Sequence, residues 1–213
     1  MMRPRPLAAW LLAFPLLAGC SGNDELQPFA VVRRADVWQA VIRADDRGRL
    51  SRLSDAWTQA QADIATAGAG AAQAALGPVA DPARTSAAAL PAAGPAQCRI
   101  IRLGWRQGGD RTVPPVQAEA WAPCTLAADG IVLRLETAPG PQRFAGTLYP
   151  DVDRLVFLGS IALAGEPGRL RYGEDRDRDQ LGVLTALGDG HWRLALPWPR
   201  WSARLVLIEI RAA

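Results

Sequence analysis

The sequence contains no lysine, so its 24 basic residues are all arginines, and it has one histidine and three cysteines. Without a lysine-rich stretch, the chain lacks the basic patch that is typical of nucleic-acid binding. One histidine and distant cysteines do not provide the four ligands of a zinc site. Neither a Gly-x-Ser-x-Gly elbow nor a His-Glu-x-x-His helix occurs. We therefore expect no cofactor, no metal, no nucleic-acid partner and no enzymatic activity.

The N-terminus has the composition of a secretory signal. An apolar run, Leu7–Leu17, follows two arginines, and small residues precede Cys20. An uncleaved transmembrane helix is the alternative, but a membrane span needs about 20 residues and this run is shorter. The sequence therefore predicts a signal peptide over residues 1–19.

The end of this segment, Leu-Ala-Gly-Cys, resembles the lipobox of bacterial lipoproteins. The resemblance implies that the Cys20 thiol receives a diacylglyceryl group, that the signal is removed before it, and that the new amino terminus is acylated, as by palmitate. Several acyl chains on one residue make a durable membrane anchor. Ser21, rather than aspartate, at the next position implies the outer membrane, facing the periplasm. We therefore expect a lipid-anchored protein of the bacterial cell envelope, with the membrane as one partner and an envelope protein as another.

Besides the lipidated Cys20, the predicted mature chain contains two cysteines, Cys98 and Cys124. That chain would run from Cys20 to Ala213 and carry 22 arginines against 21 acidic residues. Two cysteines in an oxidising compartment are typically bridged, and this bridge would close a loop of about 27 residues. The alternative is a pair of buried free thiols. We expect a disulfide.

Composition divides the mature chain into three parts. Residues 20–67 contain the lipidated N-terminus and apolar residues at helical spacing, which predict a helical hairpin with a break at 45–48. Trp38 and Trp57 either pack against the body of the protein, which we favour, or form a ridge for a partner. Residues 68–97 are rich in Ala, Gly and Pro, which predicts a linker or loosely ordered strap.

The third part, residues 98–213, has the periodicity of antiparallel strands. Apolar residues alternate along 131–135, 192–196 and 206–210, whereas 155–163 is apolar on both sides, and turns rich in Gly and Pro separate these runs. The pattern predicts a mainly β (α+β) fold. We expect a small antiparallel β-barrel or sandwich of about eight strands with an N-terminal helical hairpin.

Several segments of the chain resemble a known family. They are Cys98–Gly104, Gln142–Asp151, Arg154–Gly159, Tyr172–Asp175, Arg178–Gly182 and His191–Leu194. In this order they resemble the domain-of-unknown-function family numbered 4893, which is found in bacterial envelope proteins. The resemblance covers most of the mature chain, including the helical part. It implies a domain without an assigned activity, so no catalytic residues carry over.

Four carboxylates gather between two predicted strands: Glu174, Asp175, Asp177 and Asp179. Their spacing is similar to that of a calcium loop, but the glycine at the sixth position and the glutamate at the twelfth are missing. Interleaved arginines also neutralise the charge that a cation needs. We therefore favour a solvated, salt-bridged hairpin loop over a calcium site.

A second set of polar residues flanks two predicted hairpins. Its members are Arg143, Tyr149, Asp151, Arg154, Tyr172 and Asp179. If the ends of the hairpins converge, these side chains form a polar mouth on an apolar barrel, which is a candidate binding face for a ligand or partner. The alternative is that they pin the turns by hydrogen bonding.

Two functions are compatible with these features. The first is a non-enzymatic binding or structural module of the envelope, which the anchor, the disulfide and the missing catalytic motifs suggest. The second is a lipocalin-like carrier or sensor of a small apolar ligand, which the strand count and the many Leu, Val and Trp residues suggest. The interior discriminates between them, because a barrel of about eight strands that is filled with side chains has no room for a ligand.

The variant Cys20→Ser should lose lipidation and signal removal at that site, because the thiol is the acyl acceptor. Labelling of cells with a radioactive fatty acid, followed by separation of membrane and soluble fractions, measures this. The variant Cys98→Ser is the control and should keep its label. Undiminished incorporation into Cys20→Ser would contradict the lipoprotein hypothesis.

Overall fold

The computed structural model describes residues 37–166, 171–200 and 202–213, so the predicted signal peptide and Cys20 lie outside the described residues. The helices are α1 (Val37–Val41), α2 (Ala44–Ser51), α3 (Leu53–Thr66), α4 (Gly70–Ala74) and the 3-10 helix η2 (Gly77–Ala80). The strands are β1 (Gly94–Leu103), β2 (Val116–Ala118), β3 (Ala122–Asp129), β4 (Val132–Thr137), β5 (Gln142–Asp151), β6 (Arg154–Leu163), β7 (Asp179–Gly188), β8 (His191–Pro197) and β9 (Leu205–Ala212). None of the helices in these ranges has the length and hydropathy that crossing a membrane requires.

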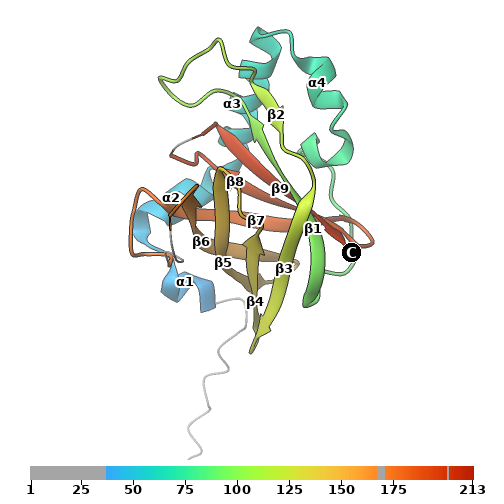
Figure 1. Cartoon of the computed structure of the whole chain (residues 1–213), viewed down its shortest axis with the longest axis vertical. Helices are drawn as coiled ribbons and strands as arrows, with labels where there is room; N and C mark the ends of the chain where they lie inside the picture. The colour runs from blue at the N-terminus through green and yellow to red at the C-terminus, as the bar shows by residue number, and fades with distance from the viewer. Residues whose placement is uncertain (1–36, 167–170, 201) are drawn as a thin grey trace, which may run out of the picture. The chain divides into compact units, whose positions relative to one another are not determined.

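Eight antiparallel strands close into a barrel (Figure 1). From β3 to β9 each strand pairs with the next, and β9 pairs with β1 along its whole length, with Ile208 opposite Ile100. The other edge of β1 pairs with β3 through its first half and with the short β2 through its second half. Closure protects the strand edges, which would otherwise pair with other chains. The predicted barrel or sandwich is therefore a barrel with one extra strand.

Large apolar side chains occupy the inside of the barrel. Phe144 of β5, Phe157 of β6 and Leu194 of β8 belong to one core cluster, and each is at most 1% exposed. The Phe157 ring lies where β5 and β6 approach closely. A Cβ atom added to Gly146 would fall 2.7 Å from this ring and 2.5 Å from the Cα of Gly159. The alternation of the sequence thus directs bulky residues into a tightly packed interior.

A disulfide bond joins Cys98 of β1 to Cys124 of β3, with the two Cα atoms 5.7 Å apart. Both cysteines belong to the interior cluster. The bond lies next to the point where β1 changes its partner from β3 to β2. The predicted bridge is confirmed.

Two apolar patches on the outside of the barrel are covered by helices. The first patch lies on β1, β8 and β9, where α3 and η2 pack with Trp57 and Val79. The second lies on β6 and β7, where Ile42 and Leu50 of the helical region are buried and Trp38 packs beside them. Trp38 and Trp57 therefore pack on the body of the protein, as favoured. Strands β6 and β7 are apolar on both sides because both of their faces are covered.

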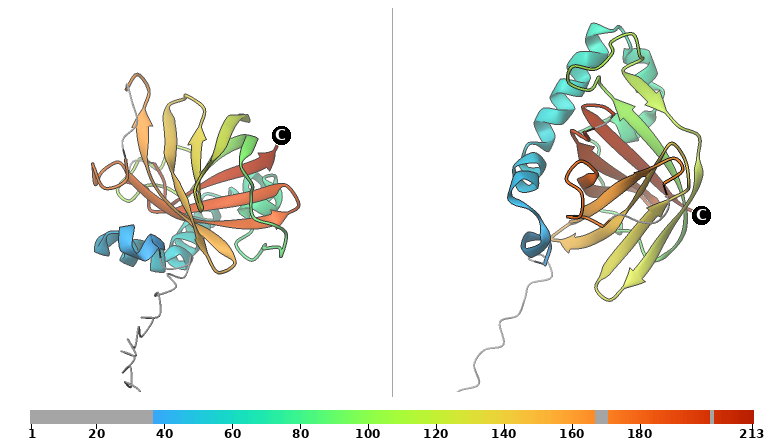
Figure 2. Two further views of the ribbon diagram at one scale, coloured as in Figure 1. Left: turned by 90° about the horizontal axis from the view of Figure 1, so that it is seen from below. Right: turned by 60° about the vertical axis from the view of Figure 1, so that its left-hand side comes forward.

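The N-terminal helices differ from the predicted hairpin. Residues 45–48, expected as a break, lie within α2, and only Arg52 separates α2 from α3. Asp45 and Asp46 stabilise the first turn of α2 through the helix dipole. Leu50 is buried and packs α2 against the barrel. The helices run one after another along the outside of the barrel (Figure 2).

The Ala-, Gly- and Pro-rich segment, residues 68–97, packs on the outside of the barrel and is called the strap below. It contains α4 and η2, and β1 begins within it at Gly94. Val79 is fully buried, and Trp192 of β8 donates a hydrogen bond from Nε1 to the carbonyl of Ala89. The strap is thus held at several points, which differs from the loosely ordered chain that its composition predicts.

A buried arginine fastens the strap. Arg193 of β8 is 4% exposed, and its guanidinium donates hydrogen bonds to the carbonyls of Val79, Asp81 and Arg84. The same guanidinium lies 5.2 Å from the centre of the Trp57 ring. Burial lowers the pKa of Arg193, while Asp81 acts in the opposite direction.

The double variant Cys98→Ser, Cys124→Ser should lower the free energy of unfolding by about 3–4 kcal/mol, because the bridge restricts the unfolded chain. Urea denaturation followed by tryptophan fluorescence measures the change. Wild-type protein treated with a thiol reductant should show the same shift. A midpoint that stays in place after reduction would contradict the stabilising role of the bridge.

Arg193→Met should loosen the strap, because it removes three hydrogen bonds from a charged donor, each of which contributes about 1.5–3 kcal/mol. Hydrogen exchange should then be faster at the amides of residues 77–86. Arg134→Met is the matched control, since Arg134 is an exposed residue of β4. Unchanged protection of the strap in Arg193→Met would show that this arginine does not fasten it.

Candidate functional site

The residues of the candidate binding face do not meet at one mouth. Arg143 lies near the start of β5 and Asp151 at its end, which places them about 26 Å apart at 3.3 Å per residue. Asp151 pairs with Arg154 at 2.8 Å across the turn between β5 and β6. This pair agrees with the alternative interpretation, in which such residues pin a turn.

Tyr172 and Asp179 lie where helix α2 packs on the barrel. The Tyr172 hydroxyl donates a hydrogen bond of 2.6 Å to Asp46 and accepts one of 3.1 Å from the backbone N–H of Arg43. Asp179 accepts a hydrogen bond from the backbone N–H of Gly173 and lies 3.4 Å from the Arg43 guanidinium. Burial is the main cause that raises the pKa of Tyr172, followed by the bond to Asp46. Burial also raises the pKa of Asp179, while Gly173 and Arg43 act to lower it.

Tyr149 belongs to the same junction, which is the place where helix α2 packs on the barrel. It packs against the apolar patch under the N-terminal helices and shares a surface groove with Tyr172. The structure therefore brings Tyr149, Tyr172 and Asp179 to one junction and leaves the other three residues of the candidate binding face outside it.

The acidic segment before β7 contacts backbone N–H groups and arginines. Asp175 accepts a hydrogen bond from the backbone N–H of Asp177, and Asp177 pairs with Arg200 at 2.9 Å. Glu174 accepts a hydrogen bond from the backbone N–H of Arg171. Within the described ranges, no group of three or more His, Cys, Asp or Glu side chains is arranged to hold a metal ion. These contacts agree with a salt-bridged loop.

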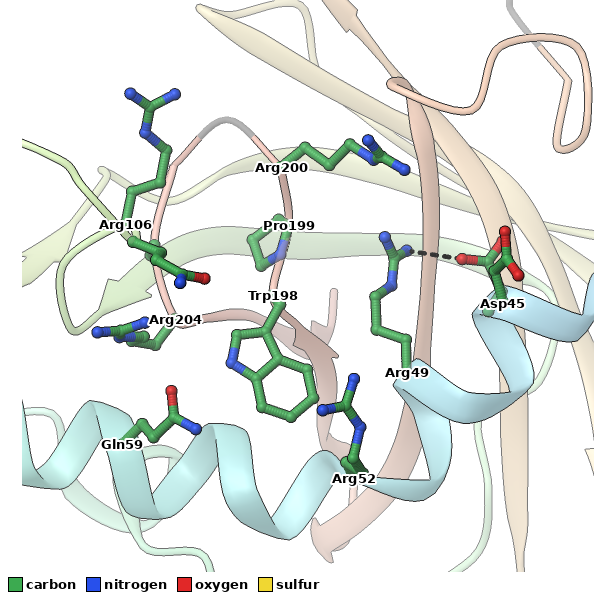
Figure 3. Close-up of a pocket in the computed structure, with 12 residues that line it drawn as sticks. Asp45, Arg49, Arg52, Gln59, Arg106, Trp198, Pro199, Arg200 and Arg204 are labelled. Atoms are coloured by element: carbon green, nitrogen blue, oxygen red, sulfur yellow. Dashed lines mark ion pairs between the residues drawn. The ribbon is translucent and has the colours of Figure 1, made fainter.

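A different site adjoins the junction and shares Asp46 with it. A pocket of about 700 Å³ lies between α2, α3 and the loops that follow β1 and β8 (Figure 3). Five arginines line it: Arg49, Arg52, Arg106, Arg200 and Arg204. We call this site the arginine pocket.

Two of these arginines come from the helical region. Arg49 of α2 lies 3.6 Å from Asp46 and donates a hydrogen bond to the carbonyl of Asp179. Its side chain is 13% exposed, and its buried Nε has no hydrogen-bond partner among the described residues. Arg52 stacks 4.8 Å from the centre of the Trp198 ring. The predicted residue Asp179 thus positions a pocket arginine through its backbone.

The other three arginines come from loops of the barrel domain. Arg204, just before β9, pairs with Asp63 of α3 at 3.1 Å. Arg200 forms its pair with Asp177 in solvent, since both side chains are more than half exposed. Arg106 follows β1 and has no ion pair within the described part of the chain.

Trp198 lies at the centre of the pocket with an unusual backbone. Its φ is 40°, a region that bulky residues rarely adopt, and prolines flank it on both sides. Its backbone N–H donates a hydrogen bond to the carbonyl of Arg204, which ties the loop to the pocket wall. Strained backbone of this kind persists only where surrounding contacts hold it, and it clusters at binding sites.

The arginine pocket concentrates positive charge. Burial lowers the pKa of Arg49, Asp46 raises it, and the charge of Arg200 lowers it again. The effect of Arg200 means that guanidinium groups of the pocket repel one another. The described lining residues include no histidine, cysteine or serine. The pocket therefore offers positive charge and hydrogen-bond donors, which suit the binding of an anion.

Sequence reasoning missed this pocket because its arginines are spread from position 49 to position 204. The strongest available signal is the Pro-Trp-Pro segment around Trp198, which predicts a turn and places an aromatic ring close to Arg200. That segment does not indicate that the helices and the loop after β1 complete the site.

The single histidine belongs to a separate buried network. His191 Nε2 lies 2.7 Å from Glu209, which is fully buried and also pairs with Arg99 and Arg211. Both arginines stack on the Trp121 ring. Because these partners compensate the buried carboxylate, the network ties β1, β8 and β9 together.

No curated protein and no solved structure matches the chain at a significant level. A family model matches residues 38–210, which include the barrel, the helices that pack on it and all five arginines of the pocket. The chain therefore belongs to the family described as a domain of unknown function (DUF4893).

Proposed function

We propose that this protein is a non-enzymatic, lipid-anchored binding module of the bacterial cell envelope that works through its outer surface. The resemblance of the segment ending at Cys20 to a lipobox supports the anchor. The arginine pocket supports binding, because it is a concave site with oriented donors. The absence of an assigned activity in the family is compatible with this function.

The contrast between the two sides of the barrel carries the proposal. Inside, Phe144, Phe157, Leu135 and Leu148 are almost completely buried in one cluster. Outside, pockets lined by described residues lie among helices, loops and strand surfaces. The space and the polar groups that a ligand needs therefore lie on the surface, where the helices and loops meet the barrel.

The lipocalin-like alternative requires an interior that accepts an apolar ligand. Barrels of about eight strands hold either packed side chains or one small ligand. The Phe157 ring between Gly146 and Gly159 takes up interior space that a ligand would need. These contacts favour surface binding over a carrier.

A soluble form of the chain that begins at Ser21 should show no saturable binding of an uncharged apolar dye such as N-phenyl-1-naphthylamine. Phe157→Ala should instead bind benzene, because removal of a buried ring opens a cavity of about that size, and should lose about 3–5 kcal/mol of stability. Fluorescence titration measures binding, and urea denaturation measures stability. Saturable, stoichiometric binding of the dye by the wild-type protein would contradict surface binding and support the lipocalin-like carrier.

A further inference from the structure

We propose that the arginine pocket binds the phosphate group of an anionic ligand. This inference rests on the proposed surface binding and names the chemistry of its ligand. Three features of the pocket support it: an excess of positive charge, guanidinium donors that remain available, and the arrangement of the arginines around Trp198.

The pocket holds more positive charge than the neighbouring carboxylates neutralise. Of its two aspartates, Asp46 lies 3.6 Å from Arg49, and Asp45 lies 3.6 Å from Arg176 outside the pocket. Two further carboxylates pair with pocket arginines from outside its wall, as described above. The five pocket arginines and Arg176 together make six positive charges, and these carboxylates make four negative ones. The site therefore carries a net charge of +2.

Arg52 and Arg106 account for this excess. Within the described ranges, neither side chain has a carboxylate partner. The Nε–H of Arg52 donates a hydrogen bond to the carbonyl of Gly48, and the guanidinium stacks on Trp198. The other N–H groups of Arg52 stay available for a ligand. Positive groups held together without a counter-charge favour an anion, because the anion relieves their mutual repulsion.

Arg49 adds an unsatisfied donor in a nearly buried position. Its Nε has no acceptor among the described residues, although the side chain is only 13% exposed. A buried donor without an acceptor costs free energy. Arg49 also lines the pocket, so it contributes positive charge there, although its Nε is enclosed by the protein.

The arrangement around Trp198 suits a phosphate better than a single carboxylate. In Figure 3, Arg49 and Arg52 lie on one side of the Trp198 ring and Arg204 lies on the other, with Arg200 nearby. Guanidinium groups bind phosphate oxygens through paired N–H donors, and several of them can engage different oxygens of one phosphate. The pocket volume of about 700 Å³ also leaves room for the moiety that carries the phosphate.

Two sources offer this chemistry: a soluble phosphate compound and the headgroup of a phospholipid. Isothermal titration calorimetry on the full-length protein in an uncharged detergent distinguishes them. Inorganic pyrophosphate is the probe for the first source. Glycerophosphoglycerol, the deacylated headgroup of phosphatidylglycerol, is the probe for the second. We expect saturable binding at one site for at least one probe.

The double variant Arg106→Gln, Arg200→Gln should weaken this binding at least tenfold, because a hydrogen bond to a charged group contributes about tenfold or more in affinity. Neither change disturbs a buried ion pair, since Arg106 has none among the described residues and the pair of Arg200 is exposed. Circular dichroism and the urea midpoint verify that the variant is folded.

The double variant Arg134→Gln, Arg154→Gln is the matched control. It removes the same charge from exposed residues outside the arginine pocket. Its affinity should stay within twofold of the wild-type value. An equal loss in both double variants would overturn the proposal, because the effect would then come from net charge alone.

The tighter of the two probes identifies the source of the phosphate. Failure of both probes to bind saturably would overturn the proposal. If that happens while the barrel still excludes the apolar dye, the ligand class is wrong and the surface function stands. Uptake of the dye by the unsubstituted barrel would instead overturn the surface function itself.

Discussion

The pairing of β1 with β9 closes the sheet, and the positions of the other elements depend on this closure. Residues from Ala96 to Leu103 pair with those from Ala212 back to Leu205, so the inner and outer faces of both strands are set together. A slip of one residue in β9 would turn Ile208 outward and bring Glu209 into the apolar core. The disulfide crosslinks β1 to β3 on the other edge of the same strand.

Closure also leaves an outer surface that is partly apolar and needs a cover. The region of α1 and α2 covers β6 and β7, while α3 and the strap cover β1, β8 and β9. Charged groups buried under this cover each have partners: Arg193 has the carbonyls of the strap, and Asp46 has Tyr172. Where the helices meet the loops after β1 and β8, the cover is incomplete, and the arginine pocket occupies that place.

The candidate binding face shows where prediction from sequence stops. The sequence placed Arg143 and Asp151 beside one predicted hairpin, and the structure places both on β5, near its two ends. Tyr172 and Asp179 do occupy an important junction, although their partners Asp46 and Arg43 lie more than 120 positions away. Periodicity reports the face and order of residues along a strand. It does not report which distant elements meet at its ends.

By itself, the sequence determined the strand pattern, the cysteine pair and the family resemblance, because alternation, turn residues and spacing are properties of short stretches of chain. Only the tertiary structure decided that the sheet closes, that the strap packs on the barrel, and that the arginines of α2, the β1 loop and the β8 loop share one pocket with Trp198. The reason is physical. These contacts join residues far apart in the chain, and they exist only after strand register and closure have placed every outer surface.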